Sequence, residues 1–146
     1  MREPVRDKGR LEHMLLAISN VEEFTKDVTL EEFVKSKVLF YAVVKNIEIV
    51  GEATYMLTKE FKESQKSVPW QVIEKMRHVL VHGYYTISPE KVWDTVQEDI
   101  PVLKKQLLSI LENLYTVFIL VKEYNSLSLL NTLRGSFVFM RRAPNN

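Results

Sequence analysis

The sequence predicts an all-α fold, an up-and-down bundle of four to five helices that forms a homodimer. Apolar residues recur at helical spacing along most of the chain. Glycine is scarce, at 4 residues, so tight β-hairpins and glycine-rich phosphate loops are poorly supported. A length of 146 residues fits one globular domain better than two.

Composition excludes several classes of function. The 20 Lys and Arg residues nearly balance the 19 Asp and Glu residues, so nucleic-acid binding by overall charge alone is ruled out, although a local basic site is not. Cysteine is absent, which excludes disulfides, thiolate zinc sites and cysteine nucleophiles. The N-terminal segment lacks the apolar core of a signal peptide, so we expect a cytoplasmic protein.

The first helix is predicted over residues 5–27, and a second helix begins just after it. Thr29 and Glu32 form a potential capping box at the start of the second helix. His13 falls among the apolar positions of the first helix, where a structural role is the expectation. Those apolar positions are Leu11, Met14, Leu15, Ile18 and Val21.

Residues 36–63 are the longest helical candidate and carry two apolar stripes. A helix that is apolar on two faces must be covered on two sides. We expect one side to pack in its own bundle and the other to meet a partner subunit. The stripes are Leu39, Val43, Val50, Ala53 and Leu57, and Phe40, Val44 and Ile47.

Prolines and glycine mark the remaining helices. Pro69 fits the first turn of a helix that ends near Gly83, with Ile73, Met76 and Leu80 toward the core. Ser88 and Pro89 begin another helix. Pro101 is expected to break or kink the pattern, with Asp99 as a new cap, before a last amphipathic helix. Trp70 and Trp93 are predicted core residues.

The domain organisation we predict is a helical domain over residues 1–114 and a C-terminal extension of unknown role over residues 115–146. The extension has four basic residues and one acidic residue, a net charge of +3. Its apolar run is shorter than the roughly 20 residues that a membrane span needs, so we expect no membrane association. We expect the last helix to continue into it and to be followed by an irregular, partly exposed end.

One cluster contains the residue types of a catalytic or binding site. Residues 77–85 hold two of the three histidines, an arginine and two tyrosines. On a regular helix, Arg77 and His82 are about 140° apart around the axis, whereas His78 and His82 share a face. To act together, Arg77 and His82 need either a distorted helix end or a second chain.

Three interpretations of this cluster stay open on the residues alone. Arg77 could pair with a carboxylate such as Glu52, with structural histidines. His78 and His82 could bind a metal, although no third ligand stands at a supporting spacing. Finally, His82 could be a general acid or base and Arg77 an anion clamp, which would suffice for RNA cleavage without a metal.

Four ordered segments resemble the HepT-like toxins, a branch of the HEPN superfamily of helical ribonucleases. Arg77-x4-His82-x-Tyr84 is similar to the R-x4-H-x-Y signature of that family. The match extends over roughly residues 5–114. The other segments are Ile49-Val-Gly-Glu-Ala53, Val68-Pro-Trp-Gln-Val-Ile-Glu-Lys-Met-Arg77, and Val92-Trp93 with Asp99-Ile-Pro-Val-Leu103.

The resemblance implies a helical homodimer in which both R-x4-H motifs face one cleft. It implies the toxin of a type VII-like toxin–antitoxin system, a metal-independent endoribonuclease without a cofactor. Its RNA target would be tRNA or mRNA, and cleavage would leave 2′,3′-cyclic phosphate and 5′-hydroxyl ends. Arg77 and His82 inherit the catalytic roles. From the residues themselves, and not from the resemblance, we expect Glu52 and His78 as supporting residues.

The resemblance also implies a partner, a minimal nucleotidyltransferase antitoxin that transfers AMP to Tyr84. Tyr85 falls outside the motif, and its expected role is packing. This sequence departs from the family at His78, where similar proteins often have Asn or Asp. The alternative function is a non-catalytic HEPN-type module that recruits a nucleotidyltransferase or RNA.

Overall fold

Helices make up nearly all of the computed structural model, which describes the backbone of residues 5–141 and the side chains of residues 6–83 and 85–129. No strand occurs among these residues, so the all-α prediction is confirmed. The helices are α1 (Val5–Thr25), α2 (Leu30–Lys35), α3 (Lys37–Met56), α4 (Lys59–Ser64), α5 (Trp70–His82), α6 (Pro89–Asp94) and α7 (Ile100–Arg141), with a 3₁₀ turn at Tyr84–Thr86 and a π-helical turn at Thr95–Asp99.

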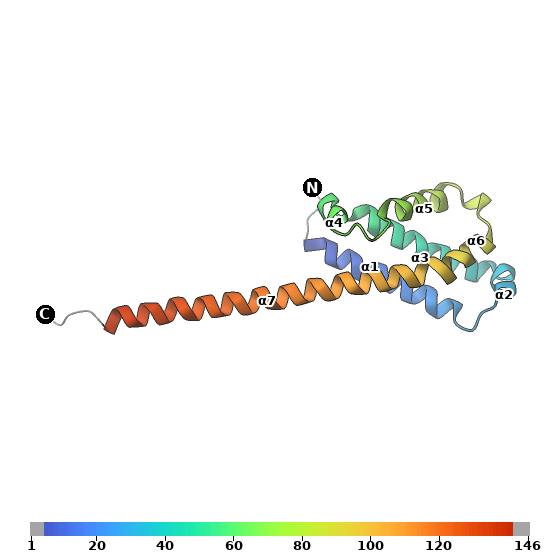
Figure 1. The fold of residues 1–146 in the computed structure, drawn as a ribbon. Helices are drawn as coiled ribbons and strands as arrows, with labels where there is room; N and C mark the ends of the chain where they lie inside the picture. Colours follow the sequence, from blue (N-terminus) through green and yellow to red (C-terminus); the bar gives the residue numbers. More distant parts are fainter. Residues whose placement is uncertain (1–4, 142–146) are drawn as a thin grey trace. The chain divides into compact units, whose positions relative to one another are not determined.

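The chain divides into two compact units, Met1–Ile110 and Leu111–Asn146. In the first unit α3 lies between α1 and α5 (Figure 1). The predicted apolar face of α1 is buried except for the half-buried Leu15, and Ile73 and Leu80 of α5 are buried as expected. The first residues of α7 complete this bundle, because Leu103, Leu107 and Ile110 are buried as well.

Both apolar stripes of α3 are covered within the chain. Val43 and Val50 of the first stripe are fully buried. Val44 and Ile47 of the second stripe are almost completely buried. The second stripe joins a core cluster with Phe33 of α2 and residues of α1, α5 and α6. The stripes therefore do not by themselves call for a partner subunit, contrary to our expectation.

The predicted helix over residues 36–63 is in fact two helices. Helix α3 ends at Met56, and Thr58 caps α4 by accepting a hydrogen bond from the backbone N–H of Phe61. The buried carboxylate of Asp7, on α1, accepts hydrogen bonds from the backbone N–H and the hydroxyl of Thr58, at 3.0 and 2.5 Å. This long-range anchor interrupts the helix, although the apolar pattern of the sequence continues past the interruption.

The helix starts and ends agree with the sequence in part. The Thr29–Glu32 capping box is confirmed. Helix α1 ends at Thr25, two residues earlier than predicted, because Asp27 has a left-handed φ of 57°. Ser88 precedes α6, but its hydroxyl bonds the Glu90 carboxylate instead of capping the backbone. This hydrogen bond lowers the pKa of Glu90.

Three further details of the helices differ from expectation. Helix α5 begins at Trp70, so Pro69 precedes the helix and does not lie in its first turn. The chain does not break at Pro101, and Asp99 is not a cap. Instead, a π-helical turn over Thr95–Asp99 leads directly into α7. A wide turn of this kind accommodates the missing proline N–H. Trp70 is buried and Trp93 packs against Phe33, as predicted.

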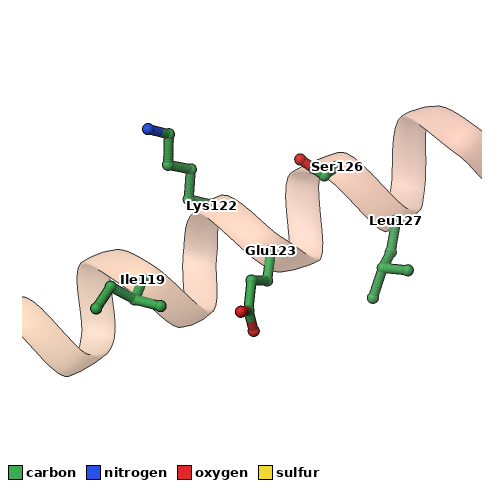
Figure 2. A pocket seen from close by; sticks show the side chains of 5 residues that line it. All are labelled: Ile119, Lys122, Glu123, Ser126 and Leu127. Carbon is green, nitrogen blue, oxygen red and sulfur yellow. The ribbon is translucent and has the colours of Figure 1, made fainter.

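The C-terminal segment is helical as far as Arg141. Helix α7 has 42 residues, so the last helix continues into this segment as predicted. The irregular end that we expected after it does not begin within residues 115–141, and residues 142–146 lie outside the described residues. No proline lies between residues 102 and 143, so nothing in the sequence stops the helix early. Side chains from Tyr115 to Leu129 are exposed, and Figure 2 shows five of them projecting from one stretch of helix. Within the described part of the chain, no helix is long and apolar enough to cross a membrane.

Candidate active site

Arg77 lies where α5 crosses α3. A Cβ atom placed on Gly51 would stand 2.4 Å from the Cβ of Arg77, so only glycine allows the two helices to approach this closely. The close contact of the two helices at Gly51 thus sets the position of the Arg77 backbone. Its own side chain remains 31% exposed, so the guanidinium is accessible from solvent.

Two residues of α3 orient the guanidinium of Arg77. Its Nε lies 2.6 Å from Oε2 of Glu52, and its Cζ lies 5.7 Å from the ring centroid of Tyr55. The ion pair agrees with the first interpretation of the sequence and leaves the other guanidinium nitrogens for a phosphate. Tyr55 was not among the predicted site residues, although its place one helical turn after Gly51 puts it on the same face.

His82 is the last residue of α5 and is exposed. His78, one turn earlier, is also exposed, and the two ring centroids are 4.6 Å apart, as their spacing predicts. The predicted stop at Gly83 is confirmed, and its N–H donates to the carbonyl of Val79 at 2.7 Å. A Cβ atom on Gly83 would be 2.9 Å from that carbonyl oxygen, so glycine is required here for close approach.

Because α5 stays helical up to His82, Arg77 and His82 lie on different faces of one regular helix. The distorted helix end that could have brought them together does not occur. Within one chain, Arg77 is held against α3 while His82 faces solvent beside His78. Of the two arrangements that the sequence left open for a joint site, the one with a second chain therefore remains.

The motif tyrosine follows the helix end. Tyr84 begins the 3₁₀ turn, and its side chain lies outside the described residues. The turn is fastened to Gly83, whose carbonyl accepts from the backbone N–H and the hydroxyl of Thr86, at 2.9 and 2.8 Å. Tyr85 is 78% exposed, so it does not pack as expected.

The histidines do not assemble a larger ligand set. Among the described residues, no three His, Asp or Glu side chains converge on one point. His13, the third histidine, is exposed on α1, where it lines a groove between α1 and α3, so it is not a core residue.

Comparison with known proteins identifies the family of this chain. Residues 14–110 match the family "Ribonuclease HepT-like". The chain belongs to the HepT-like ribonuclease family. The family match covers α3, which carries Glu52, and α5, which carries Arg77 and His82.

Several relatives of this HepT-like chain carry ribonuclease names. It is 41% identical over 102 residues to a "Putative RNase" of Caldanaerobacter subterraneus subsp. tengcongensis, covering 70% of this chain and 91% of the relative. It is 38% identical over 97 residues to a "Probable ribonuclease HepT" of Thermococcus cleftensis, covering 66% and 88%. No solved structure matches the chain.

A longer relative carries a second activity in its name. The chain is 39% identical over 131 residues to a "Gamma-glutamylcyclotransferase and putative RNase" of Methanocaldococcus jannaschii. The match covers 83% of this chain and 59% of that relative, so this chain corresponds to little more than half of the longer protein.

Proposed function

We propose that this protein is a metal-independent endoribonuclease in which Arg77 of one chain and His82 of another act on one phosphodiester. The observation that carries the proposal is the geometry of α5. A partly exposed, oriented guanidinium and an exposed imidazole occupy different faces of the same helix. A homodimer would give two equivalent combinations of the two groups.

The residue types suit RNA cleavage by transfer to the neighbouring hydroxyl. The neutral imidazole of His82 would take the proton of the ribose 2′-hydroxyl, and the 2′ oxygen would attack phosphorus. The bond from phosphorus to the 5′ oxygen would break, and that oxygen would take up a proton from water. The products are a 2′,3′-cyclic phosphate and a 5′-hydroxyl, while Arg77 would stabilise the charge on the phosphoryl oxygens.

Single substitutions test this assignment. We expect Arg77→Ala and His82→Ala each to abolish RNA cleavage and growth arrest, and we expect EDTA to have no effect. Lys75→Ala, which removes an exposed cation from the same helix, is the matched control and should cleave like the parent. If both Arg77→Ala and His82→Ala stay as toxic as the parent, the catalytic assignment is wrong and a non-catalytic binding module is the better description.

We propose further that the protein is the toxin of a toxin–antitoxin pair and that a nucleotidyltransferase antitoxin modifies Tyr84. The phenolic oxygen would attack the α-phosphorus of ATP, and pyrophosphate would leave. The product adds a bulky, negatively charged group two residues after His82, where it would obstruct the site and repel the RNA backbone.

Intact mass tests the modification. After incubation with ATP and the antitoxin, the mass of the protein should rise by whole AMP units. Tyr84→Phe should gain nothing, whereas Tyr85→Phe, which alters a neighbouring exposed tyrosine, should gain the same mass as the parent. A Tyr84→Phe protein that is still modified would remove Tyr84 from the proposal.

A further inference from the structure

A groove of about 600 Å³ lies between α1 and α3, next to the Arg77 site. Its α3 wall includes Glu52, the residue that holds the Nε of Arg77 at 2.6 Å. A ligand lying in this groove would therefore reach the ion pair that orients the proposed catalytic arginine.

The α1 wall of the groove carries two arginines and a histidine in a row. Arg6, Arg10 and His13 are spaced by four and three residues, so they follow one face of α1. This row was not predicted because the chain as a whole is nearly neutral, although the helical spacing is visible in the sequence.

Arg10 is held in place more firmly than an ordinary surface arginine. Its Nη1 donates to Oδ1 of Asp7 at 2.9 Å, and its side chain is only 13% exposed. Asp7 is in turn fixed by its two hydrogen bonds from Thr58. A guanidinium anchored through one nitrogen keeps its remaining N–H donors in a defined position, which favours binding of a phosphate.

Gly9 lies in the middle of this row, and nothing among the described residues requires glycine there. A Cβ atom built on it would have no described neighbour within 4 Å, and its φ is not positive. Glycine inside a helix costs about 1 kcal/mol relative to alanine. A ligand that approaches the α1 backbone closely would account for the glycine.

The opposite wall is apolar where it faces this row. Ile49 and Met56 of α3 line the groove and are each 38% exposed. An apolar wall facing a cationic row suits a nucleotide, whose base packs on apolar surface while its phosphates meet the cations. Among the described residues that line the groove, Glu52 is the acidic one, and it is paired with Arg77.

We infer that this groove binds the backbone of single-stranded RNA next to the cleavage site, with phosphates on Arg6, Arg10 and His13. The inference rests on the proposed function, because it assigns a place to the RNA that Arg77 and His82 would cleave. It accounts for how a nearly neutral protein binds a polyanion, since only one face has to be basic.

Binding of a short single-stranded RNA at increasing salt concentration tests the inference. The measurements use the full chain with His82→Ala, so that the RNA stays intact. Adding Arg6→Gln should weaken binding and reduce the slope of log affinity against log salt by about 0.7 for each phosphate that is no longer neutralised. Lys35→Gln, which removes the same charge from α2 outside the groove, should leave affinity and slope unchanged.

Gly9→Ala separates binding from folding. It should raise the stability of the protein and weaken RNA binding, a combination that a merely structural role of Gly9 would not give. Parent affinity and parent slope in both Gly9→Ala and Arg6→Gln would overturn the inference. A change of oligomeric mass in these variants, with an unchanged slope, would make the groove an interface between copies and would overturn it too.

The outcome is separate from that of the proposed function. If Arg77→Ala and His82→Ala lose cleavage but the groove variants bind RNA like the parent, the inference fails and the proposed function stands. If the groove variants lose affinity while Arg77→Ala and His82→Ala stay as toxic as the parent, the groove stands and the catalytic assignment fails.

Discussion

The close crossing of α3 and α5 gives a direct test through Gly51→Ala. The added Cβ would lie 2.4 Å from the Cβ of Arg77, 3.1 Å from its Cγ and 3.3 Å from its Cα. The Cβ and Cα of Arg77 cannot rotate away, because both are fixed by the backbone. Ordinary contact begins at 3.4 Å, so the two helices must separate by 1.0 Å or more at this point.

The magnitude follows from two opposing effects. Overpacking of this kind costs about 1–3 kcal/mol, while alanine gains about 1 kcal/mol over glycine inside a helix. Gly51→Ala should therefore lower the free energy of unfolding by about 1 kcal/mol. Gly9→Ala is the matched control, because it makes the same change in open space and should raise that free energy by up to about 1 kcal/mol.

Urea unfolding of the two variants measures the difference directly. We expect the free energy of unfolding of Gly51→Ala to be about 2 kcal/mol lower than that of Gly9→Ala. The slope of this free energy against urea concentration should be the same in both variants. Displacing a positioning group by about 1 Å can cost about a hundredfold in rate, so RNA cleavage by Gly51→Ala should fall severely. A Gly51→Ala protein as stable as Gly9→Ala would refute the close approach that fixes Arg77.

Three further predictions concern stability. Asp7→Ala should cost about 3–5 kcal/mol in urea unfolding, since it leaves Arg10 and Thr58 without their shared carboxylate; a cost below about 1 kcal/mol would contradict that anchor. The hydrogen bond from the backbone N–H of Thr29 lowers the pKa of Glu32, so the ionised carboxylate stabilises the folded protein. Glu32→Gln should therefore be less stable than the parent at neutral pH, and this difference should vanish as the pH falls through the lowered pKa. A difference that grows in acid would contradict the capping box. A chain that ends at residue 114 should unfold at nearly the parent temperature, because Met1–Ile110 has its own core, and a loss of cooperative unfolding would show that the extension is needed for folding.

Local signals in the sequence predicted the fold where local interactions decide it. The Thr29–Glu32 capping box and the stop at Gly83 involve residues at most four positions apart. The end of α3 was missed because Asp7, 51 residues away, decides it. The continuation of the last helix was predicted, but its full length was missed because the apolar and polar residues of this segment follow no simple stripe.

The site was predictable in its residue types and less so in its surroundings. The ion pair of Arg77 with Glu52 was among the alternatives, and the spacing of Arg77 and His82 already required a second chain or a distorted helix. The contact with Tyr55 and the fit at Gly51 depend on how α3 and α5 cross, which periodicity alone does not specify. The basic groove was hidden by a net charge of +1.

The central claim is that Arg77 and His82 of different chains form one site. Equal amounts of the Arg77→Ala and His82→Ala proteins, each inactive alone, should be unfolded, mixed, refolded together and assayed for RNA cleavage. Half of the dimers would then be mixed, and each would hold one intact site of two, so the mixture should show about a quarter of the parent activity. A mixture that cleaves no faster than either protein alone, although mixed dimers are present by mass, would contradict the account.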